Sequence, residues 1–169
     1  MSWSNIASTA CPIARSLAIV GDRWTLLVLR ELFLKQHRFE DIQAQTGMSP
    51  HLLSMRLKRL EKDGIIRRET YNQRPVRHGY RLTEKGKDLY PVLLALKAWG
   101  ERWDRGSGTR EPAVMLIHRQ CGHPTGMALA CPSCGGHFGL GDVEVKLSPF
   151  FTREREERRK AFKARRSPS

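Results

Sequence analysis

The sequence lacks any long hydrophobic run. None of its apolar stretches approaches the ~18–20 residues that a membrane-spanning helix needs. Residues 1–16, MSWSNIASTACPIARS, also lack the charged start and following apolar segment of an export signal. We therefore expect a cytoplasmic protein that has no membrane partner and is kept in a reducing compartment.

Acidic residues are scarce: 17 Asp and Glu stand against 30 Lys and Arg, which gives a net charge of +13. This balance favours a polyanionic partner, with DNA or RNA ahead of an anionic membrane surface. The sequence also lacks paired carboxylates in an apolar frame, a Gly-rich phosphate loop and an ordered Ser/His/Asp set. We therefore expect a binding protein and no enzyme.

Cysteine is rare as well. Cys11 stands alone, whereas Cys121, Cys131 and Cys134 lie close together. In a reducing compartment such a cluster indicates metal binding rather than disulfides. A chain of 169 residues is long enough for one good core and a small appendage, so the cluster can belong to a second, smaller unit.

Residues 38–81 are the centre of the prediction. A short helix over Phe39–Gln45 ends at Thr46-Gly47, where glycine tolerates the positive φ of a chain leaving a helix. Ser49 is a good N-cap and Pro50 suits a first helical position, so a second helix begins there.

The second helix has two different faces. Leu53, Leu57 and Leu60 follow the i, i+4, i+7 spacing of one apolar stripe. The opposite face carries hydrogen-bonding and cationic side chains: His51, Met55, Lys58 and Lys62, flanked by Ser54 and Arg59. A helix buried on one side and polar on the other fits the major groove of DNA.

Two strands and a basic loop follow this helix, which Gly64 ends. We predict strands over Ile65–Thr70 and His78–Leu82, with residues 71–77, YNQRPVR, as a wing that touches phosphate or the minor groove. One amphipathic helix alone would more often belong to an ordinary helical hairpin with a solvated basic face. The strand, basic loop and second strand shift the balance toward nucleic-acid binding.

Two helices are expected before this region, with residues 1–10 as a flexible N-terminus. Pro12 begins a short helix that runs to about Ile19. Asp22 can cap a second helix over Arg23–Leu34, which is apolar over most of its circumference and is therefore the expected central core helix.

A long helix is expected after the wing. Thr83 can cap it, it runs from Glu84 to about Asp104, and Pro91 should kink it. One stripe of this helix is apolar: Leu89, Val92, Leu93, Leu96, Trp99 and Trp103. The stripe exceeds what a small domain can cover, so we expect it to pack against a second copy of the chain; packing on its own domain is the alternative.

The remaining residues form three segments. Residues 106–112 are a Gly-, Ser- and Pro-containing linker, and residues 113–150 hold the cysteine cluster between strands at Val114–Ile117 and Val143–Leu147. Residues 151–169 are a basic tail with eight Lys or Arg against three Glu. The tail is expected to be a frayed helix or a disordered arm, and its charge serves either solubility or an auxiliary phosphate contact.

The cysteine cluster has the spacing of a metal site. His118-x-x-Cys121-Gly122 and Cys131-x-x-Cys134-Gly135 each place two ligands two residues apart, followed by a glycine. Together they supply three thiolates and one imidazole, a closed structural zinc site. His123 or His137 could instead be the fourth ligand, and we prefer His118 on spacing. A metal-free loop with reduced cysteines is the alternative. A redox Cys-x-x-Cys is less favoured, because the sequence offers no βαβ context.

Several motifs in order resemble the HxlR-type winged helix-turn-helix regulators, which are relatives of the MarR-like regulators. They are Cys11-Pro12, GDRWTLLVL from Gly21, RFEDI from Arg38, GMS from Gly47, LSMRLKRLE from Leu53, GII from Gly64, RPVRHGYRLTEKG from Arg74, and Trp99. The resemblance covers the first 105 residues or so. Residues 111–150 are similar to a zinc-ribbon-like extension that some members carry.

The resemblance implies a mainly α fold with a small β-wing (α+β), within residues 11–105, that ends in a dimerisation helix. It also implies a transcriptional regulator that binds a pseudo-palindromic operator in double-stranded DNA as a homodimer. Some members sense oxidants or electrophiles through a cysteine placed like Cys11, so Cys11 is the redox-sensing candidate; an inert, half-buried cysteine is the alternative. Its place at the start of a helix is the argument for sensing.

Each expected DNA contact has a role. Arg56, Lys58, Arg59 and the wing arginines would hold phosphates, whereas His51, Ser54 and Met55 would face base edges. The full set that we assign is Arg38, Ser49, His51, Ser54, Met55, Arg56, Lys58, Arg59, Arg74 and Arg77. The competing hypothesis is an RNA- or ribosome-associated zinc-ribbon protein that binds nucleic acid without reading sequence.

Overall fold

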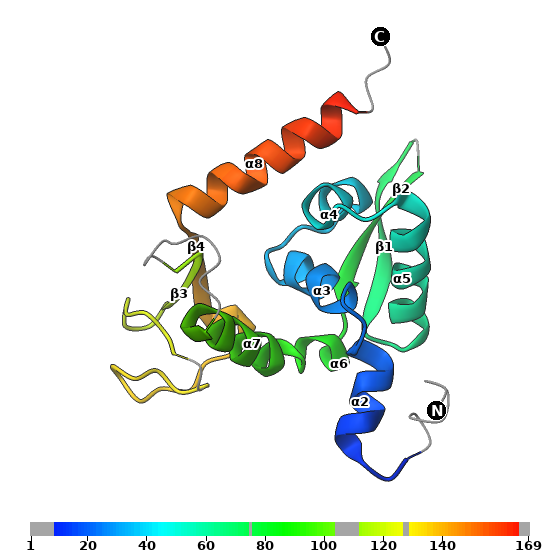
Figure 1. The fold of residues 1–169 in the computed structure, drawn as a ribbon. Helices are drawn as coiled ribbons and strands as arrows, with labels where there is room; N and C mark the ends of the chain where they lie inside the picture. Colours follow the sequence, from blue (N-terminus) through cyan, green and yellow to red (C-terminus); the bar gives the residue numbers. More distant parts are fainter. Residues whose placement is uncertain (1–8, 75, 104–111, 127–128, 166–169) are drawn as a thin grey trace. The chain divides into compact units, whose positions relative to one another are not determined.

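The computed structural model describes residues 9–74, 76–103, 112–126 and 129–165, and the chain divides into two compact units, residues 1–86 and 87–169 (Figure 1). Each unit is described by itself. Most of the expected flexible N-terminus (1–10) and of the expected linker (106–112) lies outside the described residues.

Among the described residues, the first unit has four helices before its hairpin, close to the predicted positions. They are α2 (Pro12–Val20), α3 (Thr25–Phe33), α4 (Phe39–Thr46) and α5 (Pro50–Lys62). The predicted start of α3 at Arg23 was wrong by two residues. Asp22 Oδ1 accepts hydrogen bonds from the backbone N–H groups of Trp24 (2.9 Å) and Thr25 (3.1 Å), so the regular helix begins only after this cap.

The core of the first unit centres on α3, as predicted. Val28, Leu29, Leu32 and Phe33 of this helix are buried, and the inner stripe of α5 is buried against the same core. α3 and α4 pack on strand β2 (Val76–Leu82), and α5 packs on strand β1 (Ile66–Gln73) (Figure 1). The helix-turn-helix is therefore fixed on one compact support.

The hairpin differs from its prediction. Residues 71–77 were expected to be an open loop, but β1 and β2 pair through them as far as Asn72↔Arg77 and Gln73↔Val76. The antiparallel register shifts between Thr70 and Asn72, so Tyr71 is an extra residue, a β-bulge, in β1. Polar composition had suggested a loop, whereas cross-strand pairing makes a longer and stiffer wing.

The helix after the wing is two helices and not one kinked helix. Thr83 caps it as predicted, since its Oγ1 accepts from the Gly86 N–H (3.2 Å). The chain forms α6 (Glu84–Lys87), leaves the helix, and restarts as α7 (Tyr90–Trp103). Pro91 has no N–H to donate to Lys87, and its ring crowds the preceding turn, so it interrupts the helix.

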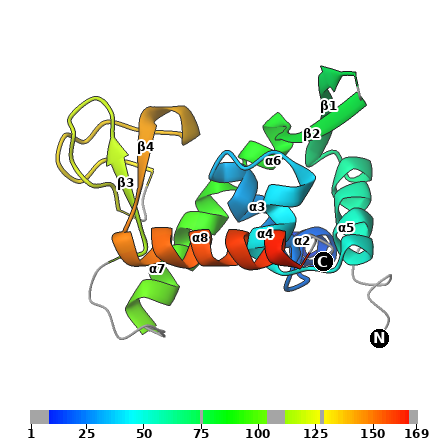
Figure 2. The same cartoon turned by 90° about the horizontal axis from the view of Figure 1, so that it is seen from above.

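The second unit contains α7, a small hairpin and a terminal helix. Strands β3 (Val114–His118) and β4 (Val143–Leu147) are antiparallel, and the short 3-10 helix η1 (Leu140–Asp142) leads into β4 (Figure 2). Of the two states expected for the basic tail, the helix is present, as α8 (Pro149–Ala164). The mainly α fold with a small β-wing and a Cys/His unit is confirmed.

Among the residues that the structure describes, no helix is both long enough and apolar enough to cross a bilayer.

Candidate nucleic-acid interface and metal centre

The turn between α4 and α5 is built as the sequence predicted. Gly47 has a φ of 71°, in the left-handed region, and Ser49 Oγ accepts from the Leu52 N–H (3.3 Å). Gln43, which is buried, donates from Nε2 to the Met48 carbonyl (3.2 Å) and holds the turn from inside. These contacts set the angle at which α5 leaves α4.

The two faces of α5 are separated as predicted. Leu53, Leu57 and Leu60 are buried in the core. On the opposite side His51, Met55, Lys58, Arg59 and Lys62 are exposed, and Ser54 is half-buried. Met55 leaves 50% of its surface accessible although it is apolar. A methionine in this position suits contact with a base edge rather than with the core.

Two arginines of α5 have carboxylate partners within the unit. Arg56 Nη1 lies 3.3 Å from Asp22 Oδ2, and Arg59 Nε lies 2.8 Å from Asp63 Oδ2. The Arg59–Asp63 pair joins neighbouring turns of one helix, and Arg59 keeps 56% of its side chain exposed. The Asp22–Arg56 pair joins α3 to α5, and sequence reasoning missed it because nothing local relates residues so far apart.

The wing positions its arginines in two ways. Arg67 Nη2 and Arg81 Nε lie 2.7 Å and 3.4 Å from the carboxylate of Glu69, and the hydrogen bond from Arg67 lowers the pKa of Glu69 below its ordinary value. Arg74 and Arg77, toward the end of the hairpin, are exposed. Positive charge is therefore partly neutralised by Glu69 near the base of the wing and retained near its end.

Arg38, at the start of α4, belongs to the same surface. Its Cζ lies 5.0 Å from the centroid of the Tyr71 ring, and its backbone forms an antiparallel bridge with Gly79 of β2. The Tyr71 ring lies beside Gly79, so a Cβ at residue 79 would be 3.6 Å from Tyr71 Cδ1 and 3.4 Å from the His37 carbonyl oxygen. Sequence reasoning found Arg38 but missed Tyr71, whose position depends on the bulge.

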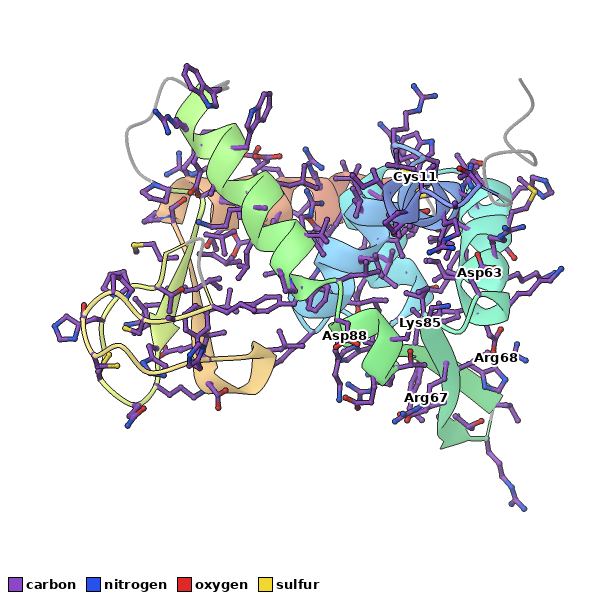
Figure 3. All side chains as sticks on the ribbon, turned by 90° about the horizontal axis from the view of Figure 1, so that it is seen from below. Cys11, Asp63, Arg67, Arg68, Lys85 and Asp88 are labelled. Carbon is purple, nitrogen blue, oxygen red and sulfur yellow. The ribbon has the colours of Figure 1, made fainter. Side chains whose placement is uncertain are left out.

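The junction of α5, β1 and α6 is tied by polar contacts that sequence reasoning also missed. Lys85 Nζ donates to the Asp63 carbonyl (2.8 Å), and Thr83 Oγ1 donates to the Gly64 carbonyl (2.6 Å); Figure 3 labels Asp63 and Lys85. Arg68, also labelled in Figure 3, is exposed on β1. These contacts hold the end of α5 against the beginning of the wing.

Four candidate metal ligands meet in the second unit. The ligand atoms of His118, Cys121, Cys131 and Cys134 all lie within 4.8 Å of one another. His118 Nδ1 is 3.4 Å from both the Cys121 and Cys134 sulfurs, and the Cys121 and Cys131 sulfurs are 3.5 Å apart. Ordinary Zn–S and Zn–N bonds around a tetrahedral ion require separations of roughly 3.5–3.8 Å, so these spacings fit such an ion.

The two halves of the cluster share one backbone geometry. The Gly122 N–H donates to the His118 carbonyl and the Gly135 N–H donates to the Cys131 carbonyl, both at 2.8 Å. Gly122 and Gly135 have φ angles of 73° and 71°. In each half the first ligand also donates its N–H to the carbonyl five residues on, His118 to His123 and Cys131 to Gly136. This equivalence supports His118 as the ligand, since His123 and His137 lie outside the cluster.

Backbone amides and close packing prepare the cluster for an ion. Burial alone would raise the pKa of Cys131, but N–H groups of Cys134 and Ser133 and the neighbouring thiols lower it to about 6. The His123 N–H lowers the pKa of Cys121, but burial and the other thiols outweigh it and the net shift is upward. At Gly136 a Cβ would lie 3.4 Å from both Cys134 Sγ and His118 Cε1, so glycine leaves room for the ligands.

Comparison with known proteins agrees with this geometry. Residues 19–107 match the family described as HxlR-like helix-turn-helix. The chain belongs to this family. A relative of this HxlR-like chain, "Uncharacterized HTH-type transcriptional regulator Rv3095" of Mycobacterium tuberculosis, is 37% identical over 140 residues, which cover 82% of this chain and 87% of the relative. A stretch of that coverage necessarily includes the Cys/His cluster, so the relative continues through this part of the chain.

Two solved structures are similar to this HxlR-like chain. The putative transcription factor PA1607 has a TM-score of 0.64 at 30% identity, covering 84% of this chain and 98% of its own. The redox regulator HypR in its reduced form has a TM-score of 0.51 at 32% identity, covering 54% of this chain and 92% of its own. This HxlR-like chain is therefore a transcriptional regulator with a helix-turn-helix DNA-binding domain.

The N-terminal cysteine of this HxlR-like chain is accessible. Cys11 is a free, exposed cysteine at the N-cap of α2, and its N–H donates to Thr9 Oγ1 (3.2 Å) (Figure 3). The residue is thus exposed, not half-buried.

Proposed function

We propose that the chain binds a pseudo-palindromic operator in duplex DNA as a homodimer. In this proposal α5 enters the major groove and the β1–β2 hairpin follows the neighbouring phosphates or minor groove. The observation that carries it is the division of α5, with one face sealed in the core and the other exposing His51, Met55 and Lys58. The buried face of such a helix packs on the domain, and its exposed face can contact the bases of the major groove.

The contact residues divide by chemistry. His51, Ser54 and Met55 face base edges, whereas Arg38, Ser49, Lys58, Arg59, Arg74 and Arg77 contact the sugar-phosphate backbone. Arg56 contacts a phosphate from its anchored position, because its partner Asp22 already fixes the direction of the guanidinium. Phosphate contacts set register, and the three groove-facing side chains set sequence preference.

Dimerisation is assigned to α7, the last helix of the predicted 11–105 domain. Val92, Leu96, Trp99 and Trp103 follow i, i+4, i+7, i+11 spacing and expose between 42% and 66% of their surfaces. An apolar stripe of this size, with two tryptophans, supports burial against the same stripe of a second copy.

The second unit, predicted as residues 113–150, is proposed to hold a structural zinc ion through His118, Cys121, Cys131 and Cys134. Its small hairpin supports this, because so short a segment buries too little apolar surface for a stable core of its own. Metal binding would supply the missing folding free energy. The exposed Cys11 is the proposed site of redox sensing. Support comes from its place at a helix start and from the likeness to HypR, which is described as a redox regulator.

Selection of genomic DNA fragments by the purified protein tests the proposal. We expect enrichment of fragments with two inverted half-sites one helical turn, or a multiple of it, apart. Arg77→Ala should weaken binding to all duplexes, whereas Ser54→Ala should change which fragments are enriched. Uniform recovery of all duplexes, or preference for single-stranded RNA, would contradict sequence-specific DNA binding and favour the alternative of a zinc-ribbon RNA-binding protein.

A further inference from the structure

Helix α8 is anchored firmly to the hairpin of the second unit. Ser148, which is buried, follows β4 directly and donates its N–H to the Ala113 carbonyl (3.0 Å). Its Oγ accepts from the Phe151 N–H (3.2 Å), and its carbonyl accepts from the Thr152 N–H (2.9 Å). The first turn of α8 is therefore fixed on the β3–β4 hairpin and sets the direction of the whole helix (Figure 2).

The two sides of α8 have different chemistry. Phe151, Arg155 and Phe162 lie on one side by helical spacing and are buried or half-buried, and Arg155 Cζ lies 5.5 Å from the Phe151 ring centroid. The other side, here called the cationic face, is exposed and carries Arg153, Arg159, Lys160 and Lys163. Glu156 and Glu157 contribute two negative charges to this face, which keeps a net positive charge.

We propose that the cationic face of α8 binds the phosphate backbone of duplex DNA outside the part contacted by the helix-turn-helix. Arg153 and Lys163 are ten residues apart, about 15 Å along a helix. Over that length one strand of B-DNA presents about four phosphates, at 3.4 Å per strand, so the face is long enough to contact several of them. The family match ends at residue 107, so this contact belongs to the extension and not to the common domain.

The chemistry of α8 favours nucleic acid over a lipid surface. A helix that lies in a membrane interface exposes a continuous apolar face. In α8 the aromatic side chains Phe151 and Phe162 are half-buried, and only Phe150, in the first turn, is an exposed large apolar residue. The exposed surface is therefore charged along its length, as a phosphate-binding helix requires.

This contact deepens the DNA-binding function and rests on it. Because phosphate contacts carry no sequence information, the cationic face should raise affinity for all duplexes alike. It should also make binding more sensitive to salt, because each phosphate that is neutralised releases condensed counterions.

Two double variants of the full-length protein test the proposal with matched charge. Lys160→Gln/Lys163→Gln removes two charges from the cationic face, and Arg158→Gln/Arg165→Gln removes two charges from another side of the same helix. Both keep good helix formers, and far-UV circular dichroism checks that α8 stays helical. Binding to a 30-base-pair duplex of random sequence is measured between low and moderate salt.

We expect the first double variant to reduce the slope of log Kd against log salt by about 1.8, since each lost phosphate contact is worth about 0.9. The second variant should change the slope by less than half as much. Equal slopes for the two variants would show a general charge effect and overturn the proposal. The proposal is also overturned if Lys160→Gln/Lys163→Gln weakens binding to phosphatidylserine vesicles more than it weakens binding to the duplex.

The Arg77→Ala variant separates this proposal from the operator-binding proposal in the same measurement. If Arg77→Ala weakens binding and Lys160→Gln/Lys163→Gln does not, the contact by α8 is wrong and the docking of the wing stands. If neither changes the binding of duplex, both proposals are wrong.

Discussion

Asp22 and Arg56 join the beginning of α3 to the middle of α5. One carboxylate oxygen of Asp22 caps α3 through the Trp24 and Thr25 N–H groups, and the other accepts from the Thr25 hydroxyl and lies 3.3 Å from Arg56 Nη1. The Nε of Arg56 is buried and has no hydrogen-bond partner among the described residues. The orientation of α5 therefore depends on a residue that precedes Arg56 by 34 positions in the sequence.

Asp22→Asn should lower the free energy of unfolding by about 1 kcal/mol. Asparagine still caps a helix, so the loss comes from the half-buried ion pair, between the values for exposed and buried pairs. Asp63→Asn, which breaks the i, i+4 pair with the more exposed Arg59, should cost under about 0.5 kcal/mol. Urea denaturation measures both free energies of unfolding. An Asp22→Asn protein as stable as the parent would show that the Asp22–Arg56 ion pair does not stabilise the unit.

Tyr71 should act on DNA binding through Arg38. The ring restrains the guanidinium before DNA arrives, and an exposed cation–π contact is worth about 0.5–1 kcal/mol, or a factor of roughly 2–5 in Kd. We expect Tyr71→Ala to weaken binding by this factor and Tyr71→Phe to leave it unchanged. In an Arg38→Ala background Tyr71→Ala should have no further effect; additive losses would mean that Tyr71 contacts DNA itself.

Removing the metal should unfold the small hairpin unit and spare the helix-turn-helix. We expect about one zinc per chain in gently purified protein and less than about half in Cys131→Ser, because a closed site needs all four ligands. Elemental analysis measures this, and Cys11→Ser is the control that should retain full zinc. A Cys131→Ser protein with undiminished zinc would show that the cluster is not the site.

Burial of the α7 stripe should depend on Trp99. Trp99→Asp places a charge in the proposed dimer interface and should raise the dimer dissociation constant by at least about tenfold, since a buried unpaired charge costs several kcal/mol. Lys97→Gln, on the same helix, is the matched control. Light scattering over a concentration series gives the mass, and a parent protein that is monomeric at all concentrations would refute the interface.

Acid should weaken the first unit through His37. Burial lowers the pKa of His37 below 6.5, and Arg81 and Lys35 lower it further, while Glu69 and the Tyr80 backbone oppose them. The unfolded chain therefore binds more protons, and the stability contributed by neutral His37 is lost as pH falls below about 6.5. Urea unfolding at pH 7.5 and 5.5 should show a smaller decrease for His37→Gln than for the parent. An equal decrease would assign the acid sensitivity elsewhere.

Local patterns predicted much of this molecule. The stripe of Leu53, Leu57 and Leu60 needed only helical periodicity, and Ser49 needed only capping chemistry. The two metal-binding turns were also visible, because each is complete within five residues and ends in a glycine at positive φ. These features depend on near neighbours in the chain, so the sequence contains their full description.

Other features depended on contacts between distant residues. Tyr71 lies near Arg38 only because β1 has a bulge and β2 bridges to the start of α4. The length of the wing was underestimated because its polar composition outweighed the pairing energy between strands. The break before α7 was predicted as a kink, since Pro91 indicates a disturbance but does not say whether the helix bends or restarts.

The cysteine-rich turns have an electrostatic consequence once an ion is bound. Three thiolates and one neutral imidazole around a dication carry a net charge of −1, in a chain whose formal charge is +13. Exposed Cys134 places part of that charge at the surface. DNA phosphates would be repelled from this end of the second unit and attracted to the cationic face of α8, so the metal would orient an approaching duplex as well as hold the fold.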